Sequence, residues 1–136
     1  MNLWNQLAPH LQAVTILTAF ALVLLGASNV FTRSLRATQT IAVLGTALAT
    51  LPVWHSSGVG TLATLLPCCL GAVALLLLHE ADLEFGEHRL DAAALVLLGT
   101  AGAVALGNAN DLLSLMLGLE TLSLCVAVLC GLGRGS

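Results

Sequence analysis

Five apolar stretches, separated by short polar breaks, occupy most of the 136-residue chain. They lie at residues 10–31, 38–54, 60–79, 90–106 and 111–131. A helix that crosses a bilayer needs about 20 mostly apolar residues, and these stretches are close to that length. The sequence therefore predicts an all-α, polytopic membrane protein with about five transmembrane helices. No repeat or linker divides it, so we expect residues 1–136 to form a single membrane domain.

The composition agrees with a membrane location. Hydrophobic residues make up 58% of the chain, charged residues 8%, and the mean hydropathy is +1.00. A soluble domain has about 25% charged residues. The chain has no lysine and a net charge of -3, which argues against a nucleic-acid partner and leaves the lipid bilayer as the first expected partner.

The four arginines indicate how the helices are oriented. With five spans, Arg33, Arg36, Arg89 and Arg134 all fall on one side of the membrane, and an excess of arginine marks the cytoplasmic side. We therefore expect the N-terminus outside and the C-terminus in the cytoplasm. No basic residue precedes the first apolar stretch, so we interpret it as a retained span.

Prolines and a turn sequence suggest where helices begin and end. Pro52 is expected to close the second span, and Pro67 to kink the third or to mark its first turn. In the turn at residues 107–111, Gly107 is expected in the left-handed position that ends one helix, with Asn110 or Asp111 capping the next. The fourth and fifth spans would then form an antiparallel hairpin.

Small residues recur along one face of the fourth span. Gly99, Ala103 and Gly107 are four residues apart, a spacing that lets a neighbouring helix come close. We predict that they form a helix-packing stripe. The alternative is that alanine and glycine are simply common in membrane helices.

Glu120 is the residue that most needs an explanation. Counted from Asp111, it lies about 13 to 14 Å along the fifth helix, near the middle of a core about 30 Å thick. A charged group there costs about 2.5 to 3.5 kcal/mol, so an ionisable residue at this depth is by default a functional candidate. Ser123 is the one polar neighbour a turn away, and desolvation favours a protonated Glu120 until a cation pairs with it. The alternative is a neutral glutamate that hydrogen-bonds between helices.

The remaining polar residues suggest no cofactor or metal. His79, Glu80, Glu87 and His88 flank an acidic loop and have no fixed ligand spacing, so we interpret them as a solvated loop or a subunit contact. The cysteines lie in apolar stretches without a Cys-x-x-Cys pair, as small buried residues do. No nucleotide, flavin or nucleophile motif is present. We expect no metal site and no cofactor on this chain.

Residues 89–129 contain "NAN", "DLLSLMLGLE" and "LSL" in that order. This region resembles the fourth and fifth membrane helices of the antiporter-like subunit N of proton-pumping NADH:quinone oxidoreductase, respiratory complex I. In that family the glutamate of this motif takes part in proton translocation, paired with a lysine on a later helix. The resemblance assigns this proton-relay role to Glu120 and implies a location in the bacterial inner membrane. Where the family often has a proline after "LSL", this chain has Cys125.

The resemblance also implies partners. Family members have about fourteen spans, so this chain would correspond to about the first third, and the pairing lysine would come from elsewhere in the complex. No redox chemistry is expected on this chain, which would be one part of the translocase. The alternatives are a non-conducting accessory or degenerate membrane protein within a larger complex, and a subunit K or cation/proton antiporter-like subunit, which share the "GLE" motif. A small self-sufficient exporter is the least favoured.

Overall fold

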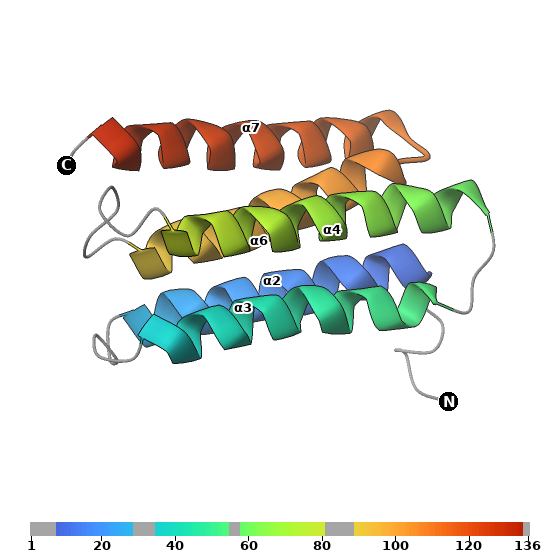
Figure 1. Ribbon diagram of the computed structural model, residues 1–136. Coiled ribbons are helices and arrows are strands. Elements are labelled where there is room, and N and C mark those ends of the chain that lie inside the picture. The colour runs from blue at the N-terminus through green and yellow to red at the C-terminus, as the bar shows by residue number, and fades with distance from the viewer. Residues whose placement is uncertain (1–7, 29–34, 55–57, 81–88, 135–136) are drawn as a thin grey trace.

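The computed structural model describes residues 8–28, 35–54, 58–80 and 89–134, which are helical almost throughout (Figure 1). The helices are α2 (Pro9–Ser28), α3 (Leu35–Thr50), the short 3-10 helix η1 (Leu51–Val53), α4 (Val59–Glu80), α6 (Arg89–Gly107) and α7 (Leu112–Arg134). Each predicted span overlaps one α-helix, and the second span also includes η1, so the all-α prediction is confirmed.

Two of the described helices are long and apolar enough to cross a membrane. Their apolar segments are Val59–Leu78 in α4 and Leu112–Leu132 in α7. The apolar segments Leu11–Val23, Thr40–Thr50 and Asp91–Gly107 are shorter. Five helices are thus established in the described chain, and two of them meet the length requirement for a span by themselves.

The two prolines act differently. Helix α3 ends at Thr50 and Pro52 lies in η1, as predicted for a residue that closes a helix. Pro67 lies inside α4, which begins well before it at Val59, so the alternative that Pro67 marks the first turn was wrong. Because proline has no N–H, it cannot donate the usual helical hydrogen bond to the carbonyl of Ala63.

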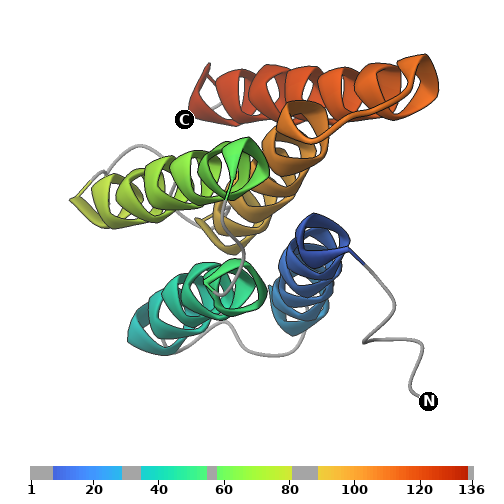
Figure 2. The same ribbon diagram turned by 90° about the vertical axis from the view of Figure 1, so that its right-hand side faces the viewer.

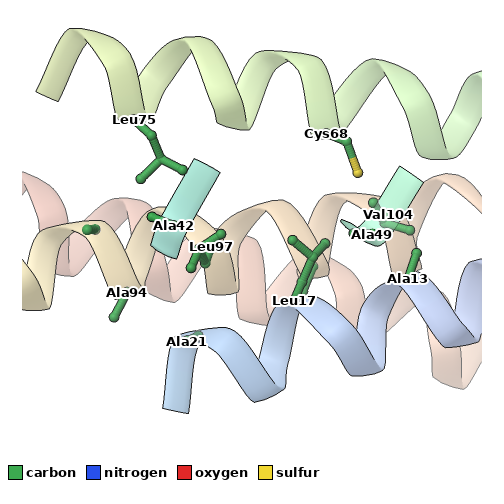
Figure 3. Close-up of a cluster of buried hydrophobic side chains, with 12 residues drawn as sticks. Ala13, Leu17, Ala21, Ala42, Ala49, Cys68, Leu75, Ala94, Leu97 and Val104 are labelled. Atoms are coloured by element: carbon green, nitrogen blue, oxygen red, sulfur yellow. The ribbon is translucent and has the colours of Figure 1, made fainter. Parts of the chain in front are cut away.

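Helix α6 is the central element of the bundle. It packs against α2, α4 and α7, as the view in Figure 2 makes visible. Its buried side chains are mostly small, which lets three neighbours approach one helix closely. They are Ala92, Ala93, Ala94, Leu97, Thr100, Ala101 and Val104. Figure 3 shows several of them beside the buried Leu17 of α2 and Cys68 and Leu75 of α4. The alanine and glycine content of this span therefore reflects its central position.

The outer faces of α4 and α7 are apolar and uncovered. On α7, Leu113, Leu117 and Leu124 each expose more than half of their surface, and α4 exposes Leu62 and Leu66 to a similar extent. Exposed apolar surface of this extent marks contact with lipid or with another protein. The outer sides of these helices therefore suit a membrane.

The helix directions place the arginine-bearing positions together. Helix α3 begins at Leu35 and α6 begins at Arg89, and α7 ends at Arg134, all at the left-hand end of the bundle in Figure 1. Arg36 lies in the first turn of α3. Arg33 lies outside the described residues. The three arginine positions that fall in described helices, 36, 89 and 134, therefore lie at one end of the bundle.

Candidate functional site

The turn between α6 and α7 begins the region around Glu120. The Asp111 side chain accepts a hydrogen bond from the backbone N–H of Ser114 at 3.0 Å, and its carbonyl accepts one from Leu115. Asp111 is thus the residue that caps α7, which decides between it and Asn110. The two hydrogen bonds from Ser114, with the side chain's contribution the larger, lower the pKa of the Asp111 carboxyl below its usual value. Helices α6 and α7 form the predicted antiparallel hairpin.

Gly107 does not take the left-handed conformation that the sequence suggested. Gly58 is the glycine with positive φ in the described chain. Beyond Gly107 the helical hydrogen bonding continues, because the N–H of Asn108 donates to Val104. A Cβ on Gly107 would lie 3.2 Å from the carbonyl oxygen of Ala63 on α4. The prediction was wrong because the position needs a small residue for close packing and not for a turn.

The closest contact between α6 and α7 lies at Gly102 and Gly118. A Cβ on Gly118 would lie 2.8 Å from the backbone nitrogen of Leu106 and 3.0 Å from the carbonyl oxygen of Gly102. A Cβ on Gly102 would in turn lie 3.1 Å from the backbone nitrogen of Leu122. Because these neighbours are backbone atoms, neither position has room for a side chain. This pair was missed in the sequence, although Gly118 belongs to the "GLE" motif quoted above.

The predicted packing stripe is divided between two partners. Gly99 faces α7, where a Cβ would lie 3.4 Å from the Cβ of Cys125, and Gly107 faces α4. Between them, Ala103 lines an apolar groove of about 420 Å³. The groove has α6 as its floor and α4 and α7 as its walls, with Leu70 and Leu122 among the lining residues. Its one polar side chain, Thr100, donates its hydroxyl hydrogen bond to Val96 in its own helix.

Glu120 lies on the side of α7 that faces away from this groove. Its side chain is exposed, whereas Gly118 and Cys125 on the inner face are buried. Ser123, the neighbour expected to assist it, donates its hydroxyl to the backbone carbonyl of Glu120 at 3.0 Å. Within the described part of the chain, no side chain pairs with the Glu120 carboxyl. The carboxyl group therefore lies on a mostly apolar surface, with Met116, Leu117 and Leu124 exposed nearby.

A partly buried polar contact joins the α6–α7 turn to α4. The side-chain nitrogen of Asn108 donates to the hydroxyl of Thr64 at 3.1 Å and to the carbonyl of Val104 at 2.9 Å. The Thr64 hydroxyl donates to the carbonyl of Gly60 at 3.0 Å, and Thr64 is fully buried. Asn108 is the first asparagine of "NAN". The sequence offered no sign of its partner, since Thr64 lies in a distant, unremarkable apolar stretch.

Some predicted residues cannot be placed. The side chains of His79, Glu80, Glu87 and His88 lie outside the described residues. No group of three or more histidine, cysteine, aspartate or glutamate residues suited to a metal ion occurs among the residues that are described.

Uncovered apolar helices around a core of small residues are features of a helical membrane protein. Comparison with known proteins points to one kind of membrane protein. The chain is 40% identical over 57 residues to the NADH-quinone oxidoreductase subunit N of Salinibacter ruber (strain DSM 13855 / M31). It is 45% identical over 71 residues to the NADH-quinone oxidoreductase subunit N 1 of Sorangium cellulosum (strain So ce56).

These similarities cover 42% and 50% of this chain but only 11% and 14% of the respective relatives. No family model and no solved structure matches the chain. The similarity thus supports a relationship to subunit N over about half of the chain. It names the same family as the resemblance described in the sequence analysis.

Proposed function

We propose that this chain is part of a membrane subunit of an NADH:quinone oxidoreductase and contributes to proton translocation. The observation that carries the proposal is Glu120, an exposed carboxyl on the apolar outer face of α7, in a chain similar to two subunits N. A carboxyl group at this depth is costly and therefore functional by default. In the proposed role it gains and loses a proton as protons cross the membrane.

The proposed relay pairs Glu120 with a lysine, and this chain contains no lysine. Glu120 faces away from α6, and the sequence has no lysine, so the pairing lysine comes from another membrane segment that covers the outer face of α7. A nearby positive charge favours the ionised carboxyl, and its withdrawal favours the protonated one. Alternating between these two states is the chemical requirement for a relay group. The chain itself takes no part in electron transfer in this proposal.

The proposed location is the bacterial inner membrane, crossed five times. The ends of α3, α6 and α7 that carry arginine positions would lie at the cytoplasmic side, because arginine excess marks that side. The N-terminus would then lie outside.

Substitution of Glu120 by glutamine tests the proposal. In membranes that contain the assembled complex, E120Q should lower the number of protons moved per NADH oxidised while leaving the amount of complex unchanged. The matched control is D111N, which makes the same carboxylate-to-amide change just before the same helix, outside its apolar segment, and keeps a capping side chain. D111N should keep the normal ratio.

An unchanged ratio in E120Q, with the complex intact, would refute the relay. It would favour the second candidate, a non-conducting accessory subunit. The observation that favours this candidate is the lack of any partner for the Glu120 carboxyl within the described chain. In that case E120L should also assemble normally and keep the ratio.

A further inference from the structure

The contact between Asn108 and Thr64 belongs to a chain of three hydrogen bonds. Both hydrogens of the Asn108 amide are used, one by the Thr64 hydroxyl and one by the Val104 carbonyl. The Thr64 hydroxyl in turn donates a hydrogen bond to the Gly60 carbonyl. The three bonds are partly shielded from solvent, so removing the Thr64 hydroxyl leaves one hydrogen of the Asn108 amide without its partner.

Two glycines, Gly60 and Gly107, make room for this contact, and a proline leaves a nearby carbonyl of α4 without its helical donor. A Cβ on Gly60 would lie 3.2 Å from the side-chain oxygen of Asn108, so a larger residue would press on the amide. Gly107, which precedes Asn108, approaches the carbonyl of Ala63, about one turn after Gly60 on α4. Pro67 leaves this carbonyl without its usual helical donor. The end of α6 is therefore held against the first turns of α4 at two neighbouring points.

Helix α7 begins only a few residues after this contact. The N–H of Ala109 donates to Leu106, and the carbonyl of Asp111 accepts from Leu115, so regular hydrogen bonds lie on both sides of Asn110. The short segment leaves little freedom between Asn108 and the first turn of α7. Fixing Asn108 on α4 thus fixes the level at which α7 starts, and Glu120 follows at a set rise of about 1.5 Å per residue.

The geometry points to Asn108 as a positioning residue for Glu120, acting through its hydrogen bond to Thr64. This inference rests on the proposed function of Glu120. The Gly102 and Gly118 contact sets the side of α7 on which Glu120 lies. The Asn108 and Thr64 contact sets its height, so that the carboxyl stays level with a partner group carried by another segment.

Removal of the hydroxyl from Thr64 with little change of shape tests this inference. In membranes that hold the assembled complex, T64V should lower the number of protons moved per NADH oxidised, with the amount of complex and the NADH oxidation rate retained. T64S keeps the hydroxyl and should restore the normal ratio. N108L should resemble T64V, and the double variant should be no worse than the more affected single variant, because both remove one interaction.

The outcomes separate the two levels of the proposal. If E120Q lowers the proton ratio and T64V and N108L do not, the positioning role is wrong and the relay stands. If E120Q itself has no effect, the relay is wrong regardless of Thr64. A fall in assembly and in NADH oxidation together, with the proton ratio unchanged in the complex that remains, would show a purely structural contact and overturn the inference. If T64V fails to assemble, the milder N108D takes its place and T64S remains the control. N108D removes the donor to Thr64 and should lower the proton ratio. An unchanged ratio in N108D would again overturn the inference.

Discussion

Gly118 lies at the closest contact between α6 and α7, and Glu120, two residues later, lies on the opposite, exposed side of α7. Two residues are separated by about 200° around a helix. Any packing that buries Gly118 against α6 therefore turns Glu120 away from α6. The Gly-Leu-Glu sequence thus combines a contact point with an outward-facing carboxyl group.

Substitution at Gly118 should separate α6 from α7. In G118A the added Cβ would meet the backbone of Leu106 and Gly102, which cannot rotate away as a side chain can. Overpacking of this kind typically costs about 1 to 3 kcal/mol. Unfolding of the purified chain in detergent, monitored by circular dichroism, measures the loss in free energy of unfolding.

The matched control for that substitution lies further along the same helix. A Cβ on Gly131 would meet nothing within 4 Å, so G131A should be neutral or slightly stabilising, as alanine favours helices. Equal stabilities for G118A and G131A would contradict the close contact at Gly118.

The Asp111 cap should make the stability of the folded chain depend on pH under acidic conditions. Hydrogen bonds from Ser114 lower the pKa of Asp111 in the folded chain below its ordinary value of 3.8. The cap therefore contributes fully above that value, and its contribution is lost as the pH falls through the folded value. Thermal unfolding in detergent at pH 7 and below pH 3.8 measures the effect.

The D111N substitution removes the negative charge at position 111 but keeps a side chain that can cap α7. D111N should still cap α7, because asparagine is an equally good capping residue, but should lack this acid-dependent contribution. D111A should be less stable than both at neutral pH. The interpretation would fail if the native chain and D111N lost the same stability between neutral and acidic pH.

The four cysteines report how α4 and α7 are rotated. Cys68 and Cys125 are buried, whereas Cys69 and Cys130 are exposed on the outer faces. A lipid-soluble maleimide should therefore label Cys69 and Cys130 before the other two. Mass spectrometry of the digested chain in lipid vesicles gives the order of labelling. Earlier labelling of Cys68 than of Cys69 would mean that α4 presents a different face to the core.

The orientation can be tested at two exposed positions. Trp54 and Asn110 lie at the end of the bundle opposite to the arginine positions, so both should face outside. In a chain whose own cysteines are replaced by alanine, W54C and N110C should react with a membrane-impermeant maleimide added to intact cells. E87C should react only after the cells are opened. The reverse pattern would place the arginine positions outside.

Much of the fold was predictable because it depends on local chemistry. The lengths of the apolar stretches indicated five helices, and each one lies close to its predicted position. Asp111 caps α7 through a hydrogen bond to a residue three positions away, so its role was among the two possibilities that the sequence left open. The change of direction between α6 and α7 was predictable for the same reason.

The features that depend on distant residues were not predictable. Gly107 looked like a turn residue, and only the approach of Ala63 on α4 shows why it must be small. Asn108 looked like part of a turn, and only the folded chain brings Thr64 to it.

The sequence alone determined that Glu120 sits deep in an apolar helix, because depth follows from position along one segment at about 1.5 Å per residue. The tertiary structure alone decided which way Glu120 faces. That direction depends on which side of α7 packs against α6, and the choice is made by the backbone contact between Gly102 and Gly118. Apolar patterning cannot reveal it, since α7 is apolar nearly all the way round.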